Sequence, residues 1–203
     1  MRKLRGGALM ALCLFLILLQ VRDTQAWSVR THEVLSRRAA EASLLNSGGL
    51  TNLDFQGLNT KISGFDFDGR RRTQEIQAWI GSGANFEDDA FPQLRFLRHF
   101  HNPLFQQPWD RAGLGQQNQS ALRWAQDVQT NPNWSWPVVR QSYYQALTLL
   151  QKPDREAQFV RVFAGLGHVI HLVQDMSQPS HVLNDAHPEA SVWTTVPAYS
   201  LET

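Results

Sequence analysis

The sequence is poor in cysteine, with a single one, Cys13, among its 203 residues. Because Cys13 lies in an N-terminal stretch that we expect to be cleaved, the remaining chain can form no disulfide. Internal repeats, low-complexity tracts and obvious linkers are also missing, which indicates one domain. A chain of this length can bury a substantial core. Its stability must therefore come from that core or from bound metal.

Residues 1–26 have the composition of a secretory signal peptide. Basic residues stand within the first five positions, and an apolar run follows over residues 8–19. That run is shorter than the roughly 20 residues that cross a bilayer, and small residues including Ala26 precede the expected cleavage point. We predict cleavage after Ala26, no stable membrane anchor, and a secreted or periplasmic protein. An uncleaved anchoring helix is the alternative.

The charge balance lacks an excess of either sign. Removal of residues 1–26 takes away four of the 19 basic residues and one of the 18 acidic residues. The 15 basic and 17 acidic residues that remain give residues 27–203 a formal charge of −2. This near-neutral balance gives no electrostatic argument for a dedicated nucleic-acid binder.

Few segments alternate with period 2, and apolar residues recur mostly with helical spacing. Start and stop signals predict helices over residues 31–45, 72–80, 92–99, 120–129, 136–150 and 153–176, and loops over 46–70 and 102–117. The longest helix begins at Pro153-Asp154, where a proline and an acid suit a first turn, and it ends before Pro179. The predicted fold class is all-α, a multi-helix bundle.

The strongest local signal lies near the end of that longest helix. His171 and Asp175 are four residues apart, so both side chains project from one helix face about one turn apart. Such a pair can bind a divalent cation, and His181 follows a helix-ending proline, so it can fold back on the same side. His168 shares the face of His171. Imidazole and carboxylate together favour zinc over calcium or magnesium; a surface or capping pair is the alternative.

Two further segments contain candidate ligands. His99 and His101 stand on alternate residues where a helix gives way to a loop, and a glycine-punctuated acidic cluster covers residues 83–89. The structural alternatives are a buried, hydrogen-bonded His101 and a helix-capping Asp89.

The residue after the cleavage point is itself a candidate ligand. A free α-amine has a pKa of about 7.7–8.0, so the amine of Trp27 would give up its proton readily to a metal. Its nitrogen and its carbonyl oxygen would form a five-membered chelate, and His32 would add a third donor. A purely packing role for Trp27 is the alternative.

In this order the motifs resemble those of the zinc-dependent phospholipase C superfamily, which also contains the single-strand-specific nucleases of fungi and plants. The matching segments span residues 27–181 and are Trp27 with His32, Gly83-Ala84-x-x-x-Asp88, His99-Phe100-x-x-Pro103 and His171-x-x-x-Asp175-x-x-Gln178-Pro179-x-His181. The resemblance implies an all-helical fold, a signal peptide and three zinc ions in a cleft.

The resemblance also implies seven zinc ligands, which are Trp27 (through its amine and carbonyl), His32, Asp88, His99, His171, Asp175 and His181. The first two would hold one ion, the next three a second, and Asp175 would bridge both. His181 would belong to a third ion. Asp88 is also the candidate catalytic residue, either as a ligand or as a general base.

The third zinc site lacks its expected partners. In the superfamily a His-x-x-x-Glu or His-x-x-x-Asp pair follows the position of His181, and no such pair occurs here. Glu202 and His187 are the only candidates, and neither has the required spacing. Because the chain ends at Thr203, where the site would be completed, we expect it to be C-terminally incomplete. The sequence thus supports two zinc ions better than a third.

The activity implied by the resemblance is hydrolysis of a phosphate ester by a zinc-bridging hydroxide. A phospholipase C is the first hypothesis, because of the overall pattern and the near-neutral charge. A single-strand nuclease is the second, because the spacing between Trp27 and His32 is short, although the cysteines typical of those nucleases are missing. A catalytically impaired zinc-binding protein is the third, because the last site is incomplete. The sequence leaves the oligomeric state open.

Overall fold

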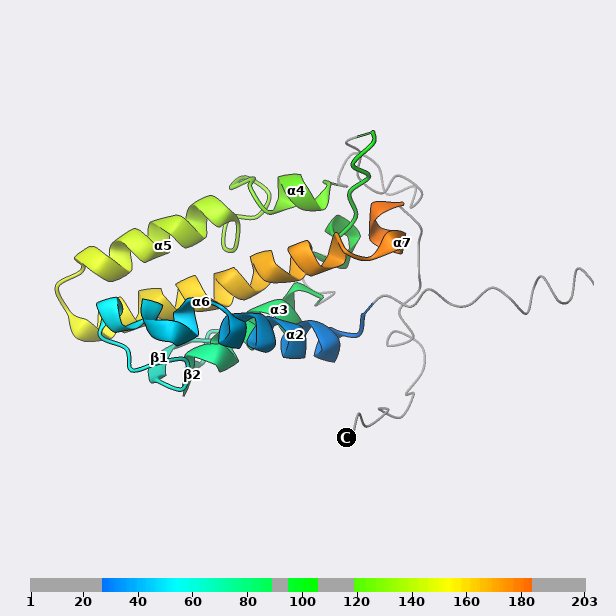
Figure 1. Cartoon of the computed structure of the whole chain (residues 1–203). Coiled ribbons are helices and arrows are strands. Elements are labelled where there is room, and N and C mark those ends of the chain that lie inside the picture. The colour runs from blue at the N-terminus through cyan, green and yellow to red at the C-terminus, as the bar shows by residue number, and fades with distance from the viewer. Residues whose placement is uncertain (1–26, 89–94, 106–118, 184–203) are drawn as a thin grey trace, which may run out of the picture. The chain divides into compact units, whose positions relative to one another are not determined.

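Helix α6 (Lys152–Asp175) is the longest of the described helices, and the others are arranged around it (Figure 1). The computed structural model describes residues 27–88, 95–105 and 119–183, which lie within one compact unit. The longer partners of α6 are α2 (Val29–Ala42), α3 (Ile76–Glu87) and α5 (Trp136–Thr148), and the short helices are α4 (Ala121–Trp124) and α7 (Pro179–Val182). The predicted all-α class is confirmed. Residues 1–26, His187, Glu202 and Thr203 lie outside the described residues.

A small hairpin occupies part of a region predicted as loop and helix. Strand β1 (Lys61–Phe65) pairs antiparallel with β2 (Arg71–Glu75), with Lys61 opposite Glu75 and Phe65 opposite Arg71. The predicted helix over residues 72–80 is therefore wrong in its first half, and α3 begins only at Ile76. Polar residues in β2 give no helical stripe, and backbone pairing with β1 supplies the hydrogen bonds that a helix would have made.

Other helix boundaries also differ from the predictions. Helix α2 ends at Ala42 instead of residue 45 and is followed by a π-helical turn (Leu45–Gly49) and a 3-10 helix (Thr51–Leu53). The predicted helix over residues 92–99 is a 3-10 helix over Arg95–Arg98 in its described part. Ser120 caps α4 as predicted, by accepting a hydrogen bond from the Arg123 N–H, but the α-helix ends at Trp124.

Helices α3 and α6 touch backbone to backbone. A Cβ placed on Gly83 would lie 1.9 Å from the carbonyl oxygen of Ala164, and one on Gly167 would lie 2.0 Å from the carbonyl oxygen of Ile80. Only glycine permits such an approach. The contact places the C-terminal turn of α3 beside the face of α6 that carries His171 and Asp175.

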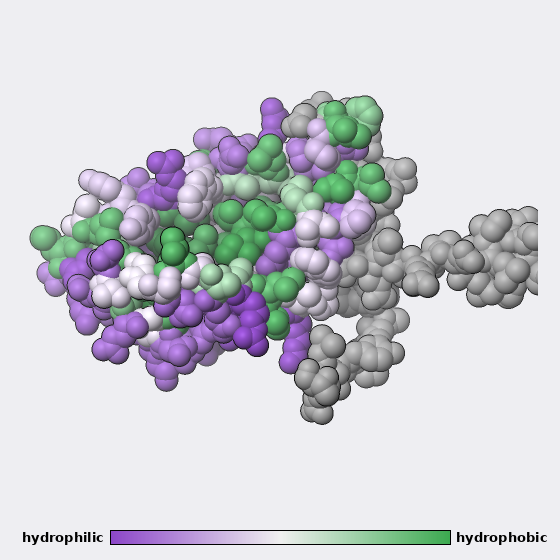
Figure 2. Space-filling view, viewed as in Figure 1, coloured by the Kyte–Doolittle hydropathy of each residue, from purple (hydrophilic) through white to green (hydrophobic). Residues whose placement is uncertain are grey.

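Apolar side chains gather along α6 between α2 and α5, where Figure 2 shows a hydrophobic band on the surface. Leu166, Val169, Ile170 and Val173 of α6 line two hollows in this band. None of the helices within residues 27–88, 95–105 and 119–183 has the length and apolar character of a membrane span.

Candidate metal centre

Six of the seven predicted ligands meet where α3 and α6 end. The side chains of His32, His99, His171, Asp175 and His181 are each at most 4 % exposed, and that of Asp88 is 7 % exposed. His32 comes from α2, Asp88 follows the last residue of α3, and His171 and Asp175 lie on the last turns of α6. Buried charged groups of this kind need partners or a metal.

Asp175 lies at the centre of the cluster. Its Oδ2 atom is 3.0 Å from Nδ1 of His99 and 3.2 Å from Nε2 of His171, and its Oδ1 atom is 3.3 Å from Nε2 of His32. The carboxylate therefore faces imidazoles on both sides, which is the position that a bridging ligand would need.

Asp88 adds a second carboxylate from the opposite helix. Its Oδ1 atom lies 3.4 Å from Nδ1 of His99 and 3.5 Å from Nε2 of His171. Two groups have ligand atoms within 4.8 Å of one another: one comprises His99, His171 and Asp175, and the other His32, Asp88 and His171. The first group contains three of the four residues that the resemblance assigns to the second ion, and it lacks Asp88. The second group joins residues that the resemblance assigns to different ions. Because His171 belongs to both groups, the geometry forms one cluster and does not divide it into separate sites.

Hydrogen bonds on the outer side hold two of the rings. Nδ1 of His171 donates to the carbonyl oxygen of Ala84 at 2.7 Å, which leaves Nε2 turned to the cluster. Nδ1 of His32 bonds to Oε1 of Gln174 at 2.7 Å, and Gln174 in turn donates to Ser36. A histidine held at one nitrogen presents the lone pair of the other to a metal.

His181 and Trp27 lie at the edges of this arrangement. Nδ1 of His181 donates to the carbonyl oxygen of His99 at 3.2 Å and lies 3.5 Å from Oδ2 of Asp175. The ring of Trp27 lies 5.8 Å from the ring of His32, measured between centroids. The structure thus places the Trp27 side chain near the cluster, and its role as an amine ligand stays a prediction.

The electrostatics of the metal-free cluster follow from burial and from Asp175. Burial opposes ionisation of Asp175, but His171 and His99 more than offset this effect and lower its pKa. Burial also opposes charge on His99 and His171, yet the Asp175 carboxylate raises the pKa of both rings. Burial lowers the pKa of His32 to about 4, so this ring is neutral at pH 7. Burial raises the pKa of Asp88.

The buried histidine and aspartate side chains could hold a metal ion. Oδ2 of Asp88 and both carboxylate oxygens of Asp175 are buried and accept no hydrogen bond of good geometry from the described residues. Such atoms are costly to bury without a partner, and a cation would satisfy them. The donors are imidazole nitrogens and carboxylate oxygens, a set that suits zinc better than the all-oxygen cages of calcium.

Metal binding is expected to release protons, because the metal must displace those that His99 and His171 hold in the metal-free cluster. Because the pKa values of both rings are raised, the protons stay bound at pH values above the ordinary histidine pKa of 6.5. Zinc competes with these protons, so its affinity should increase with pH. The increase should be about tenfold per pH unit for each displaced proton. Isothermal titration in two buffers of different ionisation enthalpy measures the release. Equal observed enthalpies in both buffers would contradict it.

Sequence reasoning missed a second buried network behind the ligands. Glu87 is fully buried and bonds to Arg95, His168 and Trp124. His168, singled out for its place on the face of His171, belongs to this network: burial and Arg95 lower its pKa to about 4 even though Glu87 opposes that shift. The acidic run at residues 87–89 was the only signal for Glu87, and it did not distinguish Glu87 from its neighbours.

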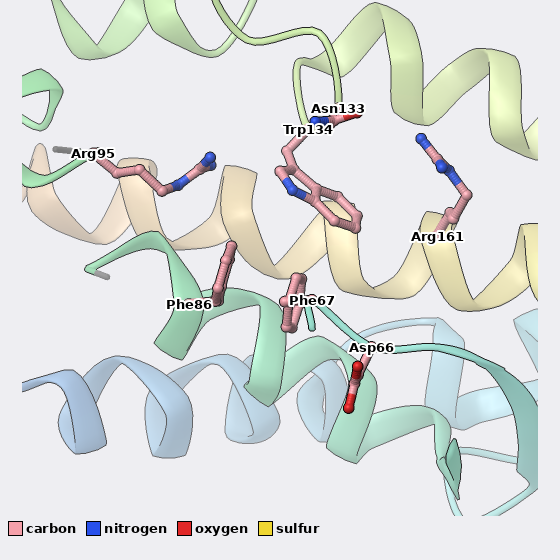
Figure 3. Close-up of a pocket in the computed structure, with 7 residues that line it drawn as sticks. All are labelled: Asp66, Phe67, Phe86, Arg95, Asn133, Trp134 and Arg161. Atoms are coloured by element: carbon pink, nitrogen blue, oxygen red, sulfur yellow. The ribbon is translucent and has the colours of Figure 1, made fainter. Parts of the chain in front are cut away.

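A cavity of about 220 Å³ lies on the other side of this network (Figure 3). Phe67 stacks on Phe86 in its wall with ring centroids 4.2 Å apart, and Trp134 packs on His168 with centroids 4.7 Å apart. Figure 3 shows Arg95 and Arg161 on either side of Trp134. The cavity is thus aromatic, with the guanidinium groups of Arg161 and of the Glu87-paired Arg95 beside it and with the Asp66 carboxylate also in its lining.

Comparisons with protein-family models, with curated proteins and with solved structures found no match to this chain.

Proposed function

We propose that this protein is a zinc-dependent phosphoric ester hydrolase. The observation that carries the proposal is the buried cluster itself, in which two carboxylates and three imidazoles from α2, α3, α6 and the segment after residue 95 converge. The family resemblance of the motifs points to the same activity.

The residues have distinct parts in this function. Asp175, placed between His32 and His99, would be the carboxylate shared by two ions, while Asp88 and His171 would complete the set. Zinc bound there would supply a hydroxide at neutral pH and neutralise phosphate oxygens. Asp88 is the more exposed of the two carboxylates, and burial raises its pKa. It would serve either as a ligand or as the base that accepts a proton from water.

A phospholipid is the substrate that we propose first. An apolar hollow is lined by His101, Leu122, Leu172, Val173 and Met176, among others. The His101 backbone N–H donates to the carbonyl oxygen of His181 at 3.1 Å, so the hollow begins beside the cluster. Acyl chains would bury apolar surface there while the head-group phosphate faced the metals.

Single-stranded nucleic acid is the second candidate substrate, and the aromatic cavity in Figure 3 favours it. Nucleobases stack on aromatic rings, and guanidinium groups attract phosphates. Because this cavity lies behind the Glu87 network, whereas the apolar hollow begins beside the cluster, we place the phospholipid first.

Zinc content and three substrates test the function. Purified protein should hold two or more zinc ions per chain and should hydrolyse a chromogenic phosphodiester, with chelator-treated protein as the blank. Phosphatidylcholine vesicles and single-stranded DNA then distinguish the two substrate classes. Zinc without hydrolysis of any of them would instead indicate a zinc-binding protein without catalysis, and fewer than two ions would exclude the two-metal mechanism.

The predicted role of Trp27 gives a separate test. One alanine added before Trp27 in the cleaved protein moves the α-amine by about 3.8 Å, so we expect the loss of about one zinc ion per chain and of most activity. Trp27→Phe, which keeps the amine and the carbonyl, is the control and should retain its metal. Metal analysis by mass spectrometry measures both variants. Full activity in the extended chain would refute the N-terminal ligand.

A further inference from the structure

Glu87 is a fully buried carboxylate that faces a predicted metal ligand from outside the cluster. Its Oε1 atom lies 3.7 Å from Nε2 of His99, while Nδ1 of the same ring lies 3.0 Å from Oδ2 of Asp175. The two nitrogens of His99 therefore face two different carboxylates. Nε2 of His99 is buried and has no hydrogen-bond partner of good geometry among the described residues, so Glu87 is the acceptor that faces it.

Three side chains fix the Glu87 carboxylate in place. Nε of Arg95 donates to Oε2 at 3.2 Å, and a second guanidinium nitrogen also bonds to this oxygen. Nδ1 of His168 donates to the same oxygen, and Nε1 of Trp124 donates to Oε1 at 2.6 Å. A buried carboxylate with a guanidinium and two further donors is an ionised, well-oriented group.

Consecutive residues at the end of α3 thus have opposite orientations. Asp88 turns its carboxylate toward His99 and His171, whereas Glu87 bonds to Arg95 on the other side. The negative charge of Glu87 is balanced by Arg95, so Glu87 does not compete with Asp88 for a metal. Besides the hydrogen bond from Trp124, Oε1 of Glu87 can accept a second one from the side that faces His99.

We propose that Glu87 is a positioning residue of the metal centre: its Oε1 atom, 3.7 Å from Nε2 of His99, closes to a hydrogen bond with Nε2–H when the metal binds and so keeps the lone pair of Nδ1 directed at the cluster. Metal-binding histidines commonly donate their other N–H to a carboxylate, which fixes the ring and increases its basicity. The inference rests on the proposed zinc binding and does not depend on ester hydrolysis.

Zinc affinity, measured by competition with a chromogenic chelator, tests the proposal. Glu87→Gln keeps the shape of the side chain and removes its charge, and it should weaken zinc binding by about 10- to 100-fold. The control is Trp79→Phe, which removes a buried hydrogen bond to the carbonyl oxygen of Ile62 within the hydrophobic core. It should lower the melting temperature of the metal-free protein and leave zinc affinity within about threefold of wild type.

A spectroscopic measurement on the wild-type protein does not depend on whether Glu87→Gln folds. Imidazole nitrogen NMR of the zinc-loaded full chain should show His99 with a protonated Nε2 and a metal-bound Nδ1. A metal-bound Nε2, or zinc affinity in Glu87→Gln equal to wild type, would overturn the proposal. Glu87-dependent zinc binding without ester hydrolysis would support it and refute the proposed function. Ester hydrolysis by a protein whose zinc affinity does not depend on Glu87 would support the proposed function and refute the positioning role of Glu87.

Discussion

Replacing Asp175 with asparagine is expected to weaken zinc binding by at least about 100-fold and to reduce phosphodiester hydrolysis to background. Loss of partners outside the ligand set already costs about 10- to 100-fold in metal affinity, and Asp175 contacts His32, His99 and His171 directly. Asparagine keeps the size of the side chain and removes the negative charge, so the ligand that we propose to be shared by two ions is lost. Chelator competition and the chromogenic assay measure the two effects.

A carboxylate elsewhere on the same helix provides the control. Glu156→Gln removes a charge near the start of α6, where Glu156 lies 4.0 Å from Lys152 in a partly exposed pair. Such pairs contribute little to stability, and this one is far from the cluster in sequence, so zinc content and activity should equal those of wild type. If Asp175→Asn bound two zinc ions as tightly as Glu156→Gln does, the central position of Asp175 would have no role in metal binding.

Gly83→Ala is the second variant with a large expected effect. The added methyl group would lie 1.9 Å from the carbonyl oxygen of Ala164, and a backbone atom has no rotamer through which to move away. Overpacking against flexible side chains costs about 1–3 kcal/mol, so we expect destabilisation of about 3 kcal/mol or more here. At about 2–4 °C per kcal/mol for a domain of this size, the melting temperature should fall by roughly 6–12 °C. Thermal denaturation followed by circular dichroism measures the change.

Gly81→Ala on the same helix is the matched control. Its methyl group would meet the flexible side chains of Arg37 and Glu33, which can shift at little cost. Alanine is favoured over glycine within a helix by about 1 kcal/mol, so this variant should be as stable as wild type or more stable. Equal melting temperatures for the two alanine variants would show that α3 and α6 can separate without penalty.

Local spacing was enough to predict the inner part of the site. His171 and Asp175 are one helical turn apart, so the sequence alone places them on one face, and the structure confirms that they lie side by side. The family resemblance of the motifs, and not local spacing, predicted His99, Asp88 and His32 as ligands. His32 and His99 do lie beside Asp175, and Asp88 lies beside His99 and His171. The assignment of each residue to a particular ion stays a prediction.

The outer part of the site and the hairpin were harder to predict, for physical reasons. The partners of Glu87 come from segments 8, 37 and 81 residues away, and no periodicity links a buried carboxylate to such distant donors. Strand β2 is short and polar. It forms because its backbone pairs with β1, and such pairing leaves no hydrophobic pattern in the sequence. The helix predicted over residues 120–129 is longer than α4, because the N-cap residue Ser120 indicates where a helix starts and not where it ends.

Two helices, α3 and α6, end at the cluster, at Glu87 and Asp175. The C-terminus of each carries the equivalent of about half a negative charge from its aligned peptide dipoles, in addition to the carboxylates of Asp88 and Asp175. Without a cation, the protons held by His99 and His171 offset part of this negative charge. A metal ion would replace those protons with a larger charge at the two helix ends, so a phosphate-ester analogue should bind more tightly to zinc-loaded protein than to protein stripped of metal.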